Sequence, residues 1–204
     1  MKKGDTLLKL KEKERETRQE LIIAAARTVF GKKTYDRVSM SEIAKAAGIA
    51  KSSIYTYFSS QESLFVEIAV QDTSRFIDNL GKQVTASDQL TLDKVISYFL
   101  DYYIEQEAQW RMITHFALHG NKSNASVEKL DLISRRLLDQ FALIFEKLGY
   151  RGDTRMLAHT LFSSLSGILI AFRKYPGRTE NEKVAHMKRI GRRFEKMFAA
   201  LKVS

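Results

Sequence analysis

The segment from Ser39 to Phe58 constrains the fold of this 204-residue chain more than any other stretch. Ser39 and Glu42 have the spacing of a capping box, which predicts that a helix begins there. Gly48 follows where the backbone is expected to need a positive φ, so this helix should end there. A second short helix should come next, with Ile54 and Phe58 facing inward. Two short helices joined by a tight turn are therefore predicted.

The remaining positions of this segment are polar and suit contact with DNA. The second helix is short and starts with small side chains, so its N-terminus can enter a major groove about 12 Å wide. Hydroxyls, a lysine and long tyrosines can reach phosphates and base edges. A plain amphipathic helix in a helical protein gives the same pattern, so both interpretations stay open on these residues alone. The candidate DNA-contacting residues are Ser39, Ser41, Lys51, Ser52, Ser53, Tyr55, Thr56 and Tyr57.

Several short runs occur together around this segment: Val29-Phe30-Gly31, Val38-Ser39-Met40, Ile43-Ala44, Ala47-Gly48-Ile49, Ile54-Tyr55-Thr56-Tyr57-Phe58 and Glu62-Ser63-Leu64-Phe65. Together they resemble the N-terminal domain of the TetR/AcrR family of transcriptional repressors, over about residues 17–65. Two positions depart from the family pattern. Ala50 stands where the family often has Ser, and Gln61 where it usually has Lys. A backbone-contacting hydroxyl and a phosphate-contacting charge are therefore missing there.

The positive charge of the chain is concentrated near its start. The net charge is +10, and residues 1–60 carry 13 Lys or Arg against 7 Asp or Glu, a net of +6. A basic N-terminal domain is what phosphate binding requires. Residues 1–15 form a basic arm that is either disordered or an extension of the first helix. A solvated basic surface is the alternative interpretation.

Composition excludes several classes of function. The chain has no Cys, so disulfides, Cys-ligated zinc and thiol chemistry are excluded. No apolar run of about 18 residues and no signal sequence are seen, which predicts a cytoplasmic protein without a membrane span. Nucleophile elbows and phosphate-binding glycine loops are absent, so we expect neither an enzyme nor a cofactor. His115 and His119 have metal-binding spacing, but a third ligand is not evident and no metal is predicted.

The pattern beyond residue 60 predicts only helices, so the fold class is all-α. The expected helices span about residues 17–30, 40–47, 50–58, 61–80, 90–107, 109–119, 125–148, 154–175 and 181–201. Gly81 is expected to close the fourth of these. We divide the chain into a helix-turn-helix domain at 1–60, with its motif at 39–58, and a C-terminal regulatory domain at 61–204. The resemblance implies that this second domain binds a ligand and dimerises.

The last two helices are apolar around much of their circumference. Burial on more than one side is expected for such helices, so pairing with a second copy across a two-fold axis would cover them. A monomeric core is the alternative, and the family resemblance favours the homodimer. Aromatic residues with interspersed polar groups also allow a cavity, although aromatic core packing gives the same pattern. The candidate ligand-binding residues are Tyr98, Tyr102, Trp110, His115, His119, Phe141, Phe145 and Phe162.

These features predict a homodimeric, sequence-specific transcriptional repressor. Its partners would be a double-stranded DNA operator and a largely apolar small molecule, bound in the C-terminal domain, that releases the protein from the operator. One alternative is a helical small-molecule binding protein or enzyme whose basic N-terminal domain is incidental. Another is a DNA-binding protein without a ligand switch.

Overall fold

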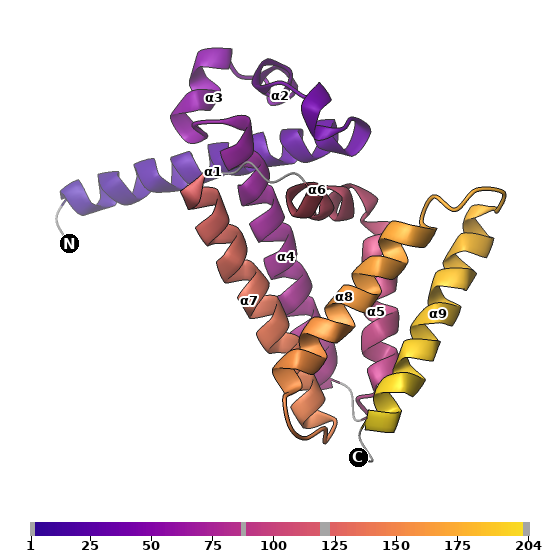
Figure 1. The fold of residues 1–204 in the computed structure, drawn as a ribbon. Coiled ribbons are helices and arrows are strands. Elements are labelled where there is room, and N and C mark those ends of the chain that lie inside the picture. Colours follow the sequence, from indigo (N-terminus) through magenta and orange to yellow (C-terminus); the bar gives the residue numbers. More distant parts are fainter. Residues whose placement is uncertain (1–2, 87–88, 119–122, 202–204) are drawn as a thin grey trace. The chain divides into compact units, whose positions relative to one another are not determined.

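The computed structural model describes residues 3–86, 89–118 and 123–201. Within these ranges the regular structure is helical and contains no strand, which confirms the predicted all-α class (Figure 1). The elements are α1 (Lys3–Lys32), the 3-10 turn η1 (Tyr35–Arg37), α2 (Met40–Ala46), α3 (Lys51–Tyr57), α4 (Gln61–Ala86), α5 (Leu92–Glu105), α6 (Glu107–Leu118), α7 (Asn124–Lys147), α8 (Thr154–Phe172) and α9 (Glu180–Leu201).

The first helix is much longer than its apolar stripe predicts. It begins at Lys3 rather than near Thr17, so the basic arm is the N-terminal part of α1 from that residue on. Its exposed turns carry opposite charges four residues apart, such as Arg18 and Glu14 with an N–O distance of 3.0 Å. Such pairs support a helix that has no core to pack against. The helix also passes through Gly31 and ends one residue later.

The turn between α2 and α3 has the predicted form. The Ser39 hydroxyl accepts a hydrogen bond from the Glu42 amide at 3.2 Å, as the capping box requires. The Glu42 carboxylate accepts from Lys33 Nζ at 2.6 Å, which ties the start of α2 to the end of α1. Gly48 has a φ of 69°, a conformation that favours glycine. The expected stop after α2 is therefore confirmed.

α4 starts with a side-chain cap and ends later than the sequence predicts. The capping pair is Ser60 and Ser63, each hydroxyl accepting from the other residue's amide at 3.0–3.1 Å. The helix also continues past Gly81 to Ala86, so the expected stop there was wrong. Val84 is buried and extends the apolar stripe of the helix by one turn, which outweighs the helix-weakening effect of a single glycine.

The chain forms two compact units that do not follow the sequence order. The first unit comprises Met1–Gln71 and Ala108–Lys129, and the second comprises Asp72–Glu107 and Leu130–Ser204. α6 therefore belongs with the N-terminal helices, whereas the division at residue 60 assigned it to the regulatory domain. Helices α4 and α7 contribute residues to both units.

Each unit has its own apolar core. In the first unit the core side chains with at most 1% exposure include Ile22, Ile23, Ala26, Ile43, Ala44 and Ile54. In the second unit α5, α8 and α9 pack together. Gly191 lets α9 approach α5 closely, because an added Cβ would lie 2.9 Å from Ile96 Cγ2 and 3.0 Å from Leu100 Cδ1. This close packing is not apparent from the sequence pattern.

Candidate nucleic-acid interface

α3 presents a polar surface from a helix held by one buried residue. Ile54 is fully buried in the core of the first unit, and Phe58, just after the helix, is 6% exposed. Because these two side chains face inward at a spacing of four residues, the other positions of α3 up to Thr56 face outward. Those exposed positions are Lys51, Ser52, Ser53, Tyr55 and Thr56. All five were candidate DNA contacts, and the structure places them on one short helix.

The start of α3 has backbone amides that no side chain caps. Ala50 is the N-cap residue in an extended conformation and provides no side-chain hydrogen bond. The amides of a helix's first turn point outward and carry partial positive charge. Lys51 adds a full positive charge at the same end. This end of α3 can therefore accept a phosphate or a base edge, although Ala50 lacks the hydroxyl that many sequences of this pattern have.

The candidate residues of α2 lie differently. Ser41 is exposed in the first turn, where a hydroxyl can reach a backbone phosphate. Ser39 is also exposed, but its hydroxyl accepts the capping bond from Glu42. A hydroxyl can still donate its proton while it accepts a bond. Ser39 can therefore hold α2 in place and contact DNA at the same time.

Tyr57 lies at the end of α3 and contacts α1. It is half-buried, unlike Tyr55 two residues earlier. The hydrogen bond to Glu14 and the charge interaction with Tyr57 raise the pKa of Arg18 above its ordinary value. A cleft of about 540 Å³ in the same unit is lined by both tyrosines and by residues of α1 and α4. Tyr57 thus joins α3 to a basic residue of α1, Arg18, that the sequence analysis did not single out.

Further basic side chains surround the two short helices. They are exposed, and they come from the end of α1, from η1 and from the last turn of α2: Lys32, Lys33, Arg37 and Lys45. None of these four residues lies in the short sequence runs that resemble the TetR/AcrR family. The signal that could have found them is their position at helix ends within the basic N-terminal segment.

Gln61 has a structural role that explains its position. Its Nε2 donates to the Tyr35 carbonyl oxygen at 2.8 Å, which joins the first turn of α4 to η1. The side chain is half-buried. A residue held in this way orients the loop that precedes α2, and it carries no charge to offer a phosphate.

The candidate ligand-binding residues are divided between the two units. Trp110 and His115 belong to the first unit, whereas Tyr98, Tyr102, Phe141, Phe145 and Phe162 belong to the second. His119 lies outside the described residues. Phe141 and Phe145 are fully buried core side chains.

Tyr98 and Tyr102 form part of an aromatic cluster around Phe76 of α4. The ring centroids of Phe76 lie 5.6 Å from Tyr98 and 5.0 Å from Tyr102. Burial, with smaller contributions from Tyr102, Asp72 and Tyr98, raises the pKa of the neighbouring Tyr103. Asp72 is itself only 2% exposed, with an N–O distance of 3.7 Å to Arg75. Sequence reasoning found the tyrosines but missed this buried carboxylate.

Metal binding has no support in the described ranges. Among residues 3–86, 89–118 and 123–201, no group of three or more His, Asp or Glu side chains is placed to hold an ion. His115 contacts aromatic rings, with centroids 4.5 Å from Tyr35 and 5.7 Å from Phe65.

Known proteins resemble this chain in sequence and in fold. Residues 22–68 match the family described as "Bacterial regulatory proteins, tetR family". The HTH-type transcriptional regulator QacR of Staphylococcus aureus is 24% identical over 139 residues, 66% of this chain and 72% of QacR. The HTH-type transcriptional regulator AcrR of Shigella flexneri is 26% identical over 167 residues, 79% of this chain and 76% of AcrR.

A solved structure extends the similarity through most of the fold. The transcriptional regulator FadR from Bacillus subtilis, in complex with stearoyl-CoA, matches with a TM-score of 0.67 and 20% identity. The match covers 85% of this chain and 95% of FadR. The family match includes α2, α3 and the start of α4, where the exposed polar helix lies. Residues 22–68, which include α2, α3 and the start of α4, therefore match the tetR family of bacterial regulatory proteins, and the rest of the chain resembles solved transcriptional regulators in fold.

Proposed function

We propose that this protein is a homodimeric repressor that binds an operator through α3 and leaves it when a small molecule binds. The observation that supports this proposal most directly is the polar, exposed surface of α3, a helix that the fully buried Ile54 holds in place. A helix held firmly on one side and free on the other can be placed in the major groove with defined register. The match of residues 22–68 to a family of bacterial regulatory proteins supports the same role.

The contacts with DNA are assigned by residue type. Lys51 and Tyr57 contact phosphates, and the hydroxyls of Ser52, Ser53 and Thr56 approach base edges. Ser39, Ser41 and Tyr55 complete the proposed contact set. Two copies of α3 in one dimer would read half-sites about one helical turn, 34–36 Å, apart. A protein acting on chromosomal operators would work in the cytoplasm.

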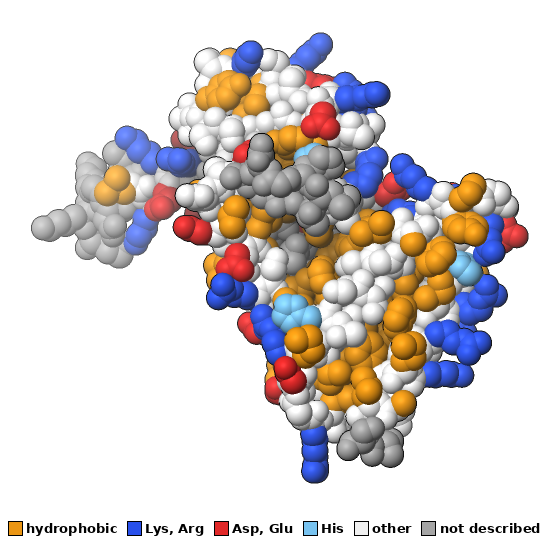
Figure 2. Space-filling view, in the orientation of Figure 1, with side chains coloured by type: hydrophobic (Ala, Val, Ile, Leu, Met, Phe, Trp, Pro, Cys, Tyr) orange, Lys and Arg blue, Asp and Glu red, His pale blue; other side chains and the backbone are white. Residues whose placement is uncertain are grey.

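Dimerisation is proposed through α8 and α9, because both expose apolar side chains. On α8, Met156 is 59% and Ile170 is 58% exposed, and on α9, Met197 is 62% exposed. Apolar side chains gather over these two helices in Figure 2. By length and composition α8 is also apolar enough to cross a membrane, with 28% of its apolar window buried. A second copy of the chain would cover this surface and leave a soluble dimer.

The proposed inducer site lies in the second unit, near the tyrosines around Phe76. Aromatic side chains with few polar groups suit contact with a largely apolar molecule, and the buried Asp72 with the tyrosine hydroxyls would fix its orientation. FadR of Bacillus subtilis was solved with stearoyl-CoA, so long-chain acyl-CoA is the first compound to test. Ligand and DNA must weaken each other's binding by the same factor, because allosteric coupling is reciprocal. We propose that the ligand acts through α4, whose residues belong to both units.

Selection of bound sequences from random duplex DNA tests the proposal directly. A repressor enriches a two-fold symmetric site and shifts it in a gel, and an added inducer reverses the shift. The logarithm of the binding constant should fall steeply with the logarithm of salt concentration. Absence of any selected sequence would refute the DNA-binding role, and would favour a small-molecule binding protein. A shift that no compound reverses would leave a regulator without the proposed switch.

A further inference from the structure

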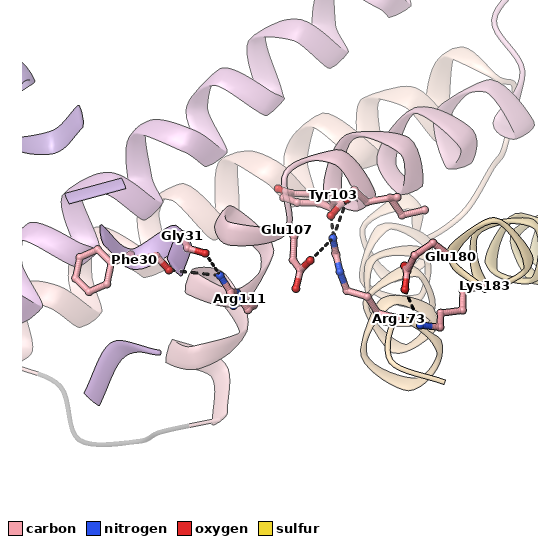
Figure 3. A network of polar contacts seen from close by, with 9 residues as sticks. Phe30, Gly31, Tyr103, Glu107, Arg111, Arg173, Glu180 and Lys183 are labelled. Carbon is pink, nitrogen blue, oxygen red and sulfur yellow. Dashed lines mark hydrogen bonds and ion pairs between the residues drawn. The ribbon is translucent and has the colours of Figure 1, made fainter. Parts of the chain in front are cut away.

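Two arginines cap the ends of two helices, but only one of them has an acidic partner. In the second unit, Arg173 donates to the carbonyl oxygens of Tyr103 and Ile104 at 2.6 and 2.7 Å, and its Nη2 lies 3.7 Å from Glu107 Oε2 (Figure 3). In the first unit, Arg111 Nη2 donates to the carbonyl oxygen of Gly31 at 2.7 Å. A longer contact of 3.4 Å reaches the Phe30 carbonyl.

Arg111 is a half-buried cation with unused donors. Within residues 3–86, 89–118 and 123–201, no carboxylate lies within 4.0 Å of its guanidinium. The two carbonyl contacts both use Nη2, so the N–H groups of Nε and Nη1 have no partner among the described residues. A guanidinium favours the planar, bidentate geometry of a carboxylate. The Arg111 guanidinium can therefore form an ion pair with a carboxylate from a bound molecule.

Arg111 is also one of the residues that line a cavity of about 220 Å³ in the first unit. Its lining combines aromatic and apolar side chains with basic ones, and none of the described lining residues is Asp or Glu. The lining residues are Phe30, Lys33, Thr34, Tyr35, Phe65, Arg111, Met112, Thr114 and His115. Lys33 is already paired with Glu42, which leaves Arg111 as the cation available to an anion entering this cavity.

Three of the aromatic rings that line this cavity pack against one another. Phe30 and Tyr35 are nearly parallel, with an interplanar angle of 5° and centroids 6.1 Å apart. Phe65 meets both rings edge-on at 4.8 Å. Aromatic rings prefer such offset and edge-to-face contacts, and a further ring can join them. The chemistry of the cavity is therefore aromatic on its walls and cationic at one point.

We propose that this cavity binds a small aromatic carboxylate, with the carboxylate on Arg111 and the ring among Phe30, Tyr35 and Phe65. The volume admits roughly ten non-hydrogen atoms, well below the size of drug-like ligands. The site lies in the unit that carries the DNA-reading helices, and it is separate from the inducer site proposed in the second unit. The proposed site can be tested independently of DNA binding, because binding of the carboxylate can be measured on the protein alone.

Calorimetric titration with benzoate and with benzamide tests the proposal. The two compounds have the same ring and similar size, but only benzoate carries a charge. Benzoate should bind saturably and at least about tenfold more tightly than benzamide, as expected for a charge-assisted bond in a partly buried site. Arg111→Gln should remove this preference, and Arg111→Lys should keep part of it. Arg173→Gln is the matched control, because it alters a similar helix cap outside the cavity, and it should leave benzoate binding within about twofold.

Three results would overturn the proposal. One is the absence of saturable benzoate binding to the unaltered protein. Another is equal affinity for benzoate and benzamide, which needs no variant and so stands even if Arg111→Gln fails to fold. The third is a loss of binding in Arg173→Gln as large as in Arg111→Gln, with both variants melting cooperatively by circular dichroism.

Discussion

α3 and α8 each have one exposed face, and these two faces differ in chemistry: one is polar and the other is apolar. α3 has seven residues with one buried, Ile54, and its free surface consists of hydroxyls, tyrosines and Lys51. α8 has nineteen residues with five buried, and its free surface includes Met156 and Ile170. Water solvates the first surface at no cost, whereas apolar area left in water is unfavourable.

This difference indicates which kind of binding partner each exposed face suits. A polar, positively charged helix end meets phosphate and base edges, where its groups exchange water for other polar partners. An apolar face of a long helix meets another apolar face, because burial is its main source of stabilisation. The two exposed faces therefore predict two different partners, and variants of each helix can test the assignment separately.

Ile170→Asp should have the largest effect, and it acts on α8. Burying an isoleucine side chain contributes about 2 kcal/mol, and a two-fold interface loses two of them while gaining two unpaired carboxylates. We expect the dimer dissociation constant to rise at least about a hundredfold. Sedimentation velocity across a concentration series measures it.

The control for α8 is Leu132→Asp, because Leu132 is 64% exposed on α7, outside the proposed interface. This variant should remain a dimer. If it dissociates as readily as Ile170→Asp, the interface has been placed on the wrong helices.

Ile54→Ala should rank second, and it removes the anchor of α3. The side chain is fully buried, so its loss should lower the free energy of unfolding by about 3 kcal/mol. Urea titration followed by circular dichroism gives this value. Thr56→Ala, on the exposed side of the same helix, should change it by less than about 0.5 kcal/mol. Equal effects of the two changes would mean that α3 is not fixed through Ile54.

Lys51→Ala should leave folding intact and weaken DNA binding. We expect about a tenfold loss of operator affinity, and a salt-dependence slope reduced by about one per protomer. Fluorescence anisotropy with labelled operator at several salt concentrations measures both. Lys147→Ala, an exposed lysine at the end of α7, should change neither quantity. An unchanged slope for Lys51→Ala would remove this residue from the phosphate contacts.

The smallest expected effect is a difference in the pH dependence of stability between two helix caps, one at the start of α9 in the second unit and one at the start of α4 in the first. Hydrogen bonds from the Thr179 amide and hydroxyl to the Glu182 carboxylate, at 2.8 and 2.9 Å, lower the pKa of Glu182 below its ordinary value. A lowered pKa means that this contribution to stability is present above the unfolded-state pKa and is lost as the pH falls through the folded-state pKa. Glu182→Gln should therefore lie closer to the unaltered protein in stability at about pH 3 than at about pH 6.

The comparison is Ser60→Ala at the start of α4, where the cap has no titratable group. Its cost, about 1 kcal/mol, should be the same at both pH values. A pH-dependent cost for Ser60→Ala, or none for Glu182→Gln, would contradict these cap assignments.

Sequence reasoning succeeded where one local rule decides the structure. The spacing of Ser39 and Glu42 predicted the start of α2, and Gly48 predicted its end. Gly81 shows where such rules fail, because a glycine near a helix end stops the helix only if apolar contacts end there too. Val84 is buried, so α4 continues. The proposed DNA-contacting and ligand-binding residues remain predictions for experiment.

The sequence by itself determined the all-α class, the short helix pair and the basic N-terminal segment, because capping, helical periodicity and charge act over a few neighbouring residues. Only the tertiary structure grouped α6 with the N-terminal helices and placed Arg111 against Gly31, eighty positions earlier in the chain. It alone brought Gly191 against α5. Contacts between residues far apart in the chain depend on the packing of whole helices, which no local pattern encodes.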